Sequence, residues 1–302
     1  MTDLTVEFAG YTFRNPITVA SGTLGSGMEY SAFVDLEKLG AITTKGVSAE
    51  PWEGNPTPRV TETPSGMMNA IGLQNPGVDV FIKRDLKFLE AFDVPVIVNV
   101  CGHSAEEYEA VLERLSSDDR VTMFEINVSC PNVKQGAIQF GTDPDMLQDI
   151  TRRCRAKAGE KPVIMKLTPN VTSIAEMAKA AEAGGADGIS LINTLTAMKI
   201  DIYRRRFVLA NKTGGLSGPA IHPVAVRMVY EASHAVNIPV IGMGGISSYE
   251  DAIEIMMAGA TMAAVGMMNF TEPDITMKII SGLEKYMAET GTERIRDIIG
   301  IV

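Results

Sequence analysis

Cys130 is the residue whose type and position best suit chemistry. It closely follows an apolar run and has an asparagine on either side, Asn127 and Asn132. A thiol at the end of a buried strand can act as a general base once it is deprotonated. The alternative is the usual fate of a free cysteine, a small buried apolar residue, and this is how we interpret Cys101 and Cys154.

Lysines and glycines end other apolar runs of the same kind. Lys45 and Lys166 each close one run, and the glycine turns Gly244-Gly245 and Gly266-Met267 follow two more. Lysine and asparagine side chains donate hydrogen bonds to ring carbonyls and carboxylates, and the backbone amides of glycine turns bind phosphate. The combination suits flavin mononucleotide, with a lysine stabilising the charge that grows on the reduced ring. A phosphorylated substrate is the other interpretation of the same glycine turns.

These residues can meet only if the apolar runs are parallel strands that share one edge. The runs are apolar along their whole length, as expected for strands that are buried on both faces. Eight such runs are present: Ile17–Ala20, Ala41–Lys45, Val94–Val100, Met123–Val128, Val163–Leu167, Gly188–Asn193, Val240–Met243 and Met262–Gly266.

Helical patterns separate many of these runs. Ser104–Leu115 begins with a capping serine, has a glutamate three residues later, and continues with apolar residues at helical spacing. The other predicted helices are Ser173–Glu182, Pro219–Val236, Tyr249–Ala258 and Asp274–Ala288. Strands and helices that alternate in this way predict a (β/α)₈ TIM barrel, with residues 1–302 as one domain.

A doubly wound sheet is the alternative fold, but the dinucleotide fingerprint does not support it. Ser247 stands where the third glycine after Gly242 and Gly244 should be. Two further features are expected to decorate the barrel. Leu4–Arg14 predicts a hairpin that caps the barrel bottom, and the long connections Gly46–Gly77 and Leu195–Gly218 are expected to be functional or to contain extra strands at the C-terminal face.

The composition excludes several classes of protein. The sequence has 302 residues, with 27 basic against 37 acidic side chains and a net charge of −10, which argues against a nucleic-acid partner. Its three cysteines are too few for a disulfide framework or for the four thiolates of a common iron–sulfur cluster. No signal peptide and no apolar run long enough to span a membrane are visible, so we expect a cytoplasmic enzyme.

The histidines show no spacing typical of a metal site. His103, His222 and His234 are far apart in the sequence, and there is neither an HExxH motif nor a cysteine cluster. We therefore expect no bound metal and interpret each histidine as a capping or surface residue.

Taken together, several motifs resemble those of the class 1 dihydroorotate dehydrogenases, and within that family the catalytic subunits of type 1B. The resemblance covers essentially the whole chain. It rests on the segments Ala20–Thr23, Thr44–Gly46, Gly54–Val78, Asn127–Gly136, Ile164–Asn170, Ile192–Thr194, Asn211–Pro223, Ile241–Ile246 and Val265–Met267.

The resemblance implies a TIM barrel that holds FMN at its top and oxidises dihydroorotate to orotate in de novo pyrimidine (UMP) synthesis. It implies that Cys130 removes the proton from substrate C5 while a hydride leaves C6 for FMN. FMN would be held by Ser21, Lys45, Gly46, Asn99, Asn127, Lys166, Ile192, Gly218, Gly244, Gly245, Gly266 and Met267. Orotate would be held by Lys45, Asn69, Ala70, Ile71, Gly72, Leu73, Asn127, Asn132, Asn193 and Thr194.

The resemblance also separates subclasses. The membrane-associated class 2 enzymes use serine as the base, whereas this sequence has Cys130. Type 1B enzymes pass electrons to NAD through a partner subunit that carries FAD and a 2Fe–2S cluster. The chain has no NAD fingerprint and too few cysteines for that cluster. We therefore expect a homodimer core with an electron-transfer subunit, as a heterotetramer.

Three other functions stay open at this point. A type 1A enzyme is a homodimer that works alone and reduces fumarate. A catalytically silent flavin- or phosphate-binding subunit would act through assembly, although Cys130, Lys45 and Asn127 together speak against it. A related barrel that reduces uracil-like pyrimidines would not need the Asn69–Leu73 turn for a substrate carboxylate.

Overall fold

Eight parallel strands form the central sheet of the protein, and their order around the sheet is their order in the chain. The computed structural model describes residues 2–128 and 140–302. The strands are β3 (Ile17–Val19), β4 (Ile42–Thr43), β7 (Val96–Val100), β8 (Met123–Asn127), β9 (Val163–Lys166), β10 (Gly188–Leu191), β15 (Val240–Met243) and β16 (Met262–Val265). Every predicted run therefore contains a strand, and the predicted barrel is confirmed.

A threonine pair closes the barrel between the first two strands. β3 and β4 stand at the two ends of the hydrogen-bonded strand order. The Thr18 hydroxyl donates to the Ala41 carbonyl at 2.9 Å and lies 3.2 Å from the Thr43 hydroxyl. The Gly40 N–H adds a bond of 2.9 Å to the Ile17 carbonyl. These contacts replace the ladder that two very short strands cannot form.

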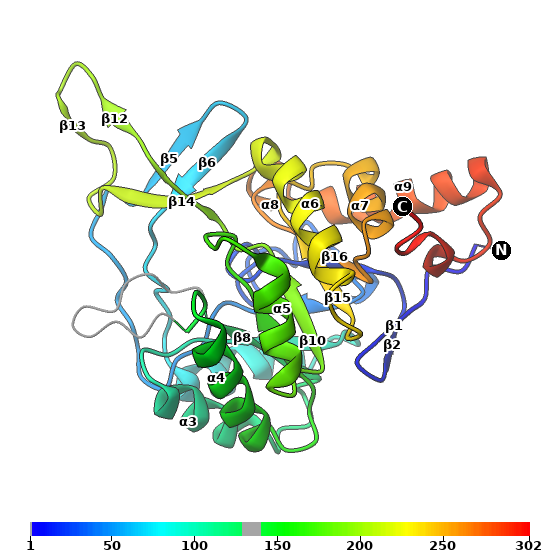
Figure 1. The fold of residues 1–302 in the computed structure, drawn as a ribbon, viewed down its shortest axis with the longest axis horizontal. Helices are drawn as coiled ribbons and strands as arrows, with labels where there is room; N and C mark the ends of the chain where they lie inside the picture. The colour runs from blue at the N-terminus through cyan, green and yellow to red at the C-terminus, as the bar shows by residue number, and fades with distance from the viewer. Residues whose placement is uncertain (1, 129–139) are drawn as a thin grey trace.

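Helices cover the outside of the sheet and connect successive strands (Figure 1). The α-helices and the intervening π-helix are α1 (Val78–Val80), η2 (Phe81–Leu86), α2 (Lys87–Leu89), α3 (Ala105–Leu115), α4 (Pro144–Lys157), α5 (Ile174–Ala183), α6 (His222–Ser233), α7 (Tyr249–Met257), α8 (Met268–Thr271) and α9 (Ile275–Thr290). Three short 3-10 turns complete the helical elements: η1 (Leu36–Lys38), η3 (Pro219–Ile221) and η4 (Ile295–Ile298).

Side-chain caps fix where several helices begin. The Ser104 hydroxyl accepts the Glu107 N–H at the start of α3, as its sequence pattern predicts. Ser173 and Ser248 cap α5 and α7 in the same way, and Asp143 caps α4. Each cap satisfies one of the backbone donors that a helix N-terminus leaves free. None of the helices formed by the described residues has the length and apolar character needed to cross a membrane.

The N-terminal hairpin seals the lower end of the barrel. β1 (Val6–Phe8) and β2 (Tyr11–Phe13) pair antiparallel, within the predicted hairpin. Phe8 is 1% exposed, and its ring fills the space that a side chain at Gly188 would occupy, at the first residue of β10. The hairpin therefore lies under the amino ends of the strands, opposite the mouth where chemistry is expected.

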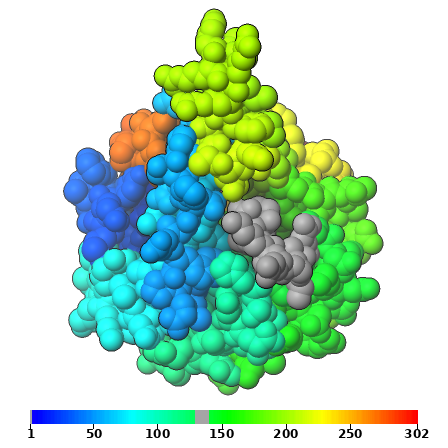
Figure 2. Space-filling model, turned by 90° about the vertical axis from the view of Figure 1, so that its left-hand side faces the viewer, coloured from blue at the N-terminus to red at the C-terminus, as the bar shows by residue number. Residues whose placement is uncertain are grey.

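The two long connections contain extra strands that build an arm on the mouth side. β11 (Leu195–Met198), β14 (Thr213–Ser217), β6 (Gly66–Asn69) and β5 (Val60–Thr63) form one antiparallel sheet. β12 (Ile200–Asp201) and β13 (Arg206–Phe207) pair beyond it. In Figure 1 the arm projects on the side opposite the chain termini. Figure 2 looks onto the arm side, where the yellow-green arm extends past the molecule and the blue 50–75 segment crosses the face.

We expect the substitution Phe8→Ala to lower the free energy of unfolding by about 3–5 kcal/mol, because it empties the space under the barrel. Tyr11→Ala is the matched control in the same hairpin, since Tyr11 is 41% exposed. Urea titration followed by circular dichroism measures both variants. Equal unfolding free energies for the two variants would show that the hairpin does not seal the core.

Candidate active site

An open cavity of about 1380 Å³ lies at the carboxyl ends of the strands. It is lined by the loops that follow the strands, by the arm sheet and by the segment that precedes β5. Residues that the sequence analysis proposed for two different ligands meet here. They are Ser21, Lys45, Gly46, Asn69, Ala70, Ile71, Gly72, Leu73, Asn127, Lys166, Ile192, Asn193, Thr194, Gly218, Gly244, Gly245, Gly266 and Met267.

Two predicted site residues, Cys130 and Asn132, fall in 129–139, outside the described residues. A third, Asn99, is described but is not on this lining. Asn99 is fully buried below the cavity, and its Nδ2 donates to Glu125 at 2.6 Å. Its Oδ1 has no hydrogen-bond donor among the described residues and faces the backbone of Gly46, where an added Cβ would lie 2.9 Å away. A buried amide oxygen without a donor marks a place where a bound group can supply one.

Two lysines give the cavity floor its charge. Lys166 ends β9 and is 4% exposed, and the partly buried Lys45 follows β4. Burial is the main cause that lowers the pKa of Lys45 below its ordinary value; the ammonium of Lys166 lowers it further, while Cys101 opposes the shift. A Cβ at Gly22 would lie 3.3 Å from Lys45 Nζ, so this glycine leaves room for the ammonium group. Among the described residues no carboxylate forms an ion pair with Lys45.

Glu125 is the carboxylate at the centre of the polar floor, and it is 1% exposed. Its Oε1 accepts from Asn99 Nδ2 at 2.6 Å and lies 3.4 Å from Lys166 Nζ, while its Oε2 accepts from the Ser190 hydroxyl at 2.8 Å. The sheet register explains the contacts, because Asn99 pairs with Glu125 and Ser190 with Lys166 on neighbouring strands. Four adjacent strands, β7 to β10, thus each supply one polar side chain to the cluster around Glu125.

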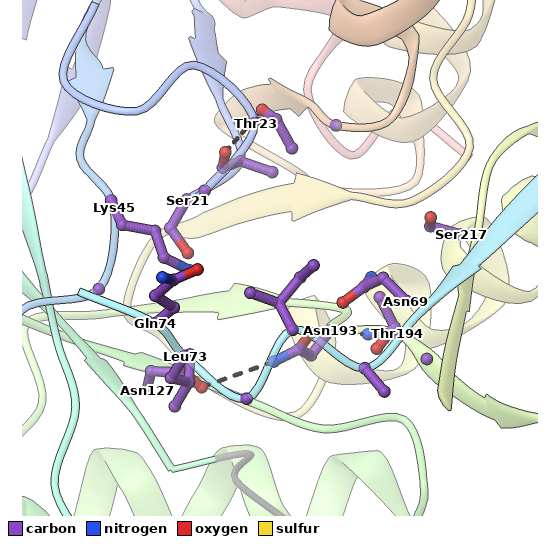
Figure 3. A pocket seen from close by; sticks show the side chains of 18 of the residues that line it. Ser21, Thr23, Lys45, Asn69, Leu73, Gln74, Asn127, Asn193, Thr194 and Ser217 are labelled. Carbon is purple, nitrogen blue, oxygen red and sulfur yellow. Dashed lines mark hydrogen bonds between the residues drawn. The ribbon is translucent and has the colours of Figure 1, made fainter. Parts of the chain in front are cut away.

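Amide side chains line another wall of the cavity (Figure 3). Asn127, at the end of β8, accepts a long hydrogen bond of 3.5 Å from Asn193 Nδ2. The Tyr108 hydroxyl, from α3, donates to the Asn127 carbonyl at 2.8 Å and fixes the end of the strand. Asn170 Nδ2 donates to the Thr194 carbonyl at 3.1 Å. Such a wall offers donors and acceptors at fixed positions to a flat heterocycle with ring carbonyls.

Glycines form the opposite end of the cavity. Gly218, Gly244 and Gly245 have φ values of +103°, +132° and +71°, a region that L side chains rarely adopt. A Cβ at Gly266 would meet only the Ala20 side chain, at 3.8 Å, so the backbone at this turn is open to a ligand. Glycine backbone of this kind can bring its amides close to a phosphate group.

Two residues that support the cavity, Glu125 and His222, were not predicted to do so from the sequence. Glu125 was given no role, although a charged residue inside a strand buried on both faces is itself a signal. His222 was interpreted as a capping or surface residue, which is wrong, because it is 7% exposed and contacts the Gly244 turn. His234 ends α6 at the surface and His103 stacks on Trp52, with ring centroids 3.9 Å apart. Cys101 and Cys154 are buried, as predicted.

The sequence is similar to known proteins along almost its whole length. A family model described as dihydroorotate dehydrogenase matches residues 3–287. A relative from Lachnoclostridium phytofermentans, named as the catalytic subunit of dihydroorotate dehydrogenase B (NAD(+)), is 62% identical over 98% of this chain and 98% of the relative. A relative of the same name from Alkaliphilus oremlandii is 55% identical over 98% of this chain and 97% of its own length.

Glu125→Gln should lower the free energy of unfolding by about 3–5 kcal/mol, because it leaves the buried Lys166 ammonium without its carboxylate partner. The double variant Glu125→Gln/Lys166→Met should recover much of that loss, since it removes both charges. Glu109→Gln, which breaks the more exposed pair with Arg153, is the control and should change stability by less than about 1 kcal/mol. A Glu125→Gln protein as stable as the unmodified one would contradict the assigned ion pair.

Proposed function

Since the chain belongs to the dihydroorotate dehydrogenase family, we propose that it is the catalytic subunit of an NAD-linked enzyme that oxidises dihydroorotate to orotate in pyrimidine biosynthesis. The observation that carries the proposal is the cavity at the barrel mouth. It joins two lysines, a wall of amide side chains and glycine turns in one space. We propose that residues 1–302 act as one FMN-binding barrel domain and work in the cytoplasm.

The residues of the cavity fit FMN. The glycine turns at Gly218, Gly244-Gly245 and Gly266 suit the phosphate, because their backbone leaves room for close approach. Lys166 and Ser21, whose polar atoms lie 3.4 Å apart, suit the ring oxygens of an isoalloxazine. The Asn99 amide oxygen that lacks a donor adds a buried acceptor beside them.

The remaining lining suits orotate. Orotate carries a carboxylate on a flat ring with two carbonyls, and the turn Asn69–Leu73 lines the same cavity as Lys45. Asn127, Asn193 and Thr194 would bond the ring edges, and Asn132 is proposed to join them. An anion is favoured here because Lys45 has no paired carboxylate among the described residues, so substrate charge offsets its burial.

The proposed chemistry divides the two hydrogens of the substrate between two faces of the ring. Cys130, three residues beyond the end of β8, takes the proton from C5 as a thiolate base. FMN, when bound, supplies the acceptor for the hydride that leaves C6. Lys45 and the asparagines hold the ring so that both bonds face their acceptors at once, which is the main role of substrate positioning.

We further propose a partner subunit that takes electrons from the site to NAD. The relatives are named as catalytic subunits of an NAD(+) enzyme, which supports a second subunit. This chain contains three cysteines and no dinucleotide fingerprint, so an FAD group and a 2Fe–2S cluster would belong to the partner. A homodimer of this chain with two partner subunits, a heterotetramer, is the proposed assembly.

Anaerobic mixing of the FMN-loaded protein with dihydroorotate tests the function. The substrate should bleach the yellow flavin absorption, and Cys130→Ala should slow the bleaching by about 10²–10⁴-fold while FMN stays bound. Cys154→Ala is the control, because burial in α4 raises the pKa of that thiol to about 12 and keeps it neutral. A protein that stays yellow with dihydroorotate would favour the catalytically silent interpretation.

Electron acceptors test the partner. The chain alone, reduced by dihydroorotate, should transfer electrons poorly to NAD, and addition of an FAD and 2Fe–2S subunit should raise NAD reduction by at least about tenfold, because electrons then have a path out of the cavity. Efficient reduction of fumarate by the chain alone, with no gain in NAD reduction from the partner, would contradict the proposal and support a type 1A enzyme.

A further inference from the structure

His222 is buried directly behind the glycine turn that follows β15. It is the first residue of α6 and is 7% exposed. A Cβ added at Gly245 would lie 2.7 Å from both the backbone nitrogen and the Cβ of His222. The histidine therefore packs against the turn on the side away from the cavity, and Gly244 and Gly245 line the cavity on the other side.

Both ring nitrogens of His222 face hydrogen-bond acceptors: a backbone carbonyl lies on one side, and carboxylates, which only accept when they are ionised, lie on the other. Nδ1 lies 2.9 Å from the carbonyl oxygen of Gly244. Nε2 lies 3.1 Å from Oε2 of Glu254 and 3.7 Å from Oδ1 of Asp251. A neutral imidazole can donate from only one nitrogen, so the other would point a lone pair at an acceptor. The doubly protonated ring satisfies both sides.

Helix α7 holds the two carboxylates in place. The Asp251 Oδ2 accepts from the backbone N–H groups of Ser247 and Ser248, at 2.7 and 3.1 Å, as part of a capping box. Asp251 and Glu254 are the charged groups that face the ring among the described residues, and both lie on α7. The ring thus connects the turn after β15 to the helix that follows that turn.

The contact with the Gly244 carbonyl also orients the amide that faces the ligand. In a trans peptide the carbonyl of one residue and the N–H of the next point in opposite directions. Because His222 draws the Gly244 carbonyl away from the cavity, the Gly245 N–H points toward it. Among the described residues this N–H donates to no protein acceptor. It is therefore a backbone donor held ready for a ligand.

We propose that doubly protonated His222 is a positioning residue for the phosphate of the bound nucleotide. It holds the Gly244 carbonyl and the α7 carboxylates together, so that the Gly245 amide is fixed toward the phosphate before binding. This inference rests on the proposed function, because it takes FMN as the ligand of the turn. The role is one of orientation, since His222 lies behind the turn and away from the cavity.

Flavin affinity tests the proposal, measured as the quenching of flavin fluorescence by the apoprotein. His222→Gln should bind FMN about tenfold to a hundredfold more weakly, the effect of one lost charge-assisted hydrogen bond. Its affinity for riboflavin, which has no phosphate, should equal that of the unmodified protein. His222→Lys should restore most of the FMN affinity, because an ammonium keeps the charge and can donate to both sides.

Two matched controls separate this role from general damage. His234→Gln replaces the histidine at the other end of α6, which bonds the Tyr230 carbonyl, and should leave both flavin affinities unchanged. Glu254→Gln removes the carboxylate from a side chain that is 60% exposed, and should weaken FMN binding alone. Glu250→Gln, a change at a neighbouring exposed residue, should leave FMN binding unchanged. Glu254→Gln and Glu250→Gln together test the proposal if His222→Gln does not fold.

The outcomes separate the inference from the function it rests on. Failure of the unmodified protein to bind FMN would contradict the proposed function. If the unmodified protein binds FMN, two results would overturn the role of His222. One is an FMN affinity of His222→Gln equal to that of the unmodified protein, and the other is an equal loss of affinity for FMN and for riboflavin. His222, Asp251 and Glu254 place ligand atoms within 4.8 Å of one another. If EDTA lowered the FMN affinity and zinc restored it, a metal ion rather than a proton would connect these groups, and the proposal would be overturned.

Discussion

An imbalance of charge at the mouth of the barrel determines the rest of the site. Lys166 is buried and Lys45 partly buried, and Glu125 is the carboxylate that the structure places against Lys166. Buried charge is expensive unless it is paired, and the lowered pKa of Lys45 reflects that cost. A cavity floor with this excess of positive charge favours an anionic ligand over water. The same imbalance makes the folded protein less stable than an apolar barrel interior would make it.

The fold tolerates the free-energy cost of the buried charges because only a small group of polar side chains lies among the described residues of the barrel interior at this level. Asn99, Glu125, Lys166 and Ser190 come from four neighbouring strands, and Glu125 contacts the other three. Apolar side chains surround them, and Phe8 closes the far end of the barrel. Networks of buried polar groups are stable when every member has a partner. Among these four residues one buried atom, Asn99 Oδ1, lacks a donor, and it lies on the cavity side beside Gly46.

The sequence predicted the strands well because continuous apolar runs are a strong signal of strands buried on both faces. Most of their C-terminal ends were predicted one or two residues too long, since Ala20, Lys45 and Asn193 belong to loops that shape the cavity, whereas β7 and β15 end where predicted. The arm strands were expected only in general terms, because residues 60–69 and 195–217 pair with each other across a long sequence separation. Helix α4, with its four basic residues among the last six, was predicted only as a helical stretch around Cys154, without bounds.

Contacts across elements account for the rest of what the sequence left out. A glutamate such as Glu125 is unexpected in an apolar strand. The structure explains it, because Lys166 and Ser190 on other strands contact its carboxylate. His222 shows no metal-type spacing to Asp251 and Glu254, because the three come together only when α6 packs beside α7. Spacing within one segment cannot reveal a group that is held between two segments.

Strand β8 connects the charge balance to the chemistry. Glu125 and Asn127 are two residues apart, so the alternation of a strand turns both toward the inside of the barrel. Glu125 pairs with Lys166 at the lower level, and Asn127 meets Asn193 at the cavity. The proposed base, Cys130, follows on the same chain segment. A shift of this strand by one residue would turn Glu125 and Asn127 outward, so the network around Glu125 also fixes the register on which the proposed substrate binding depends.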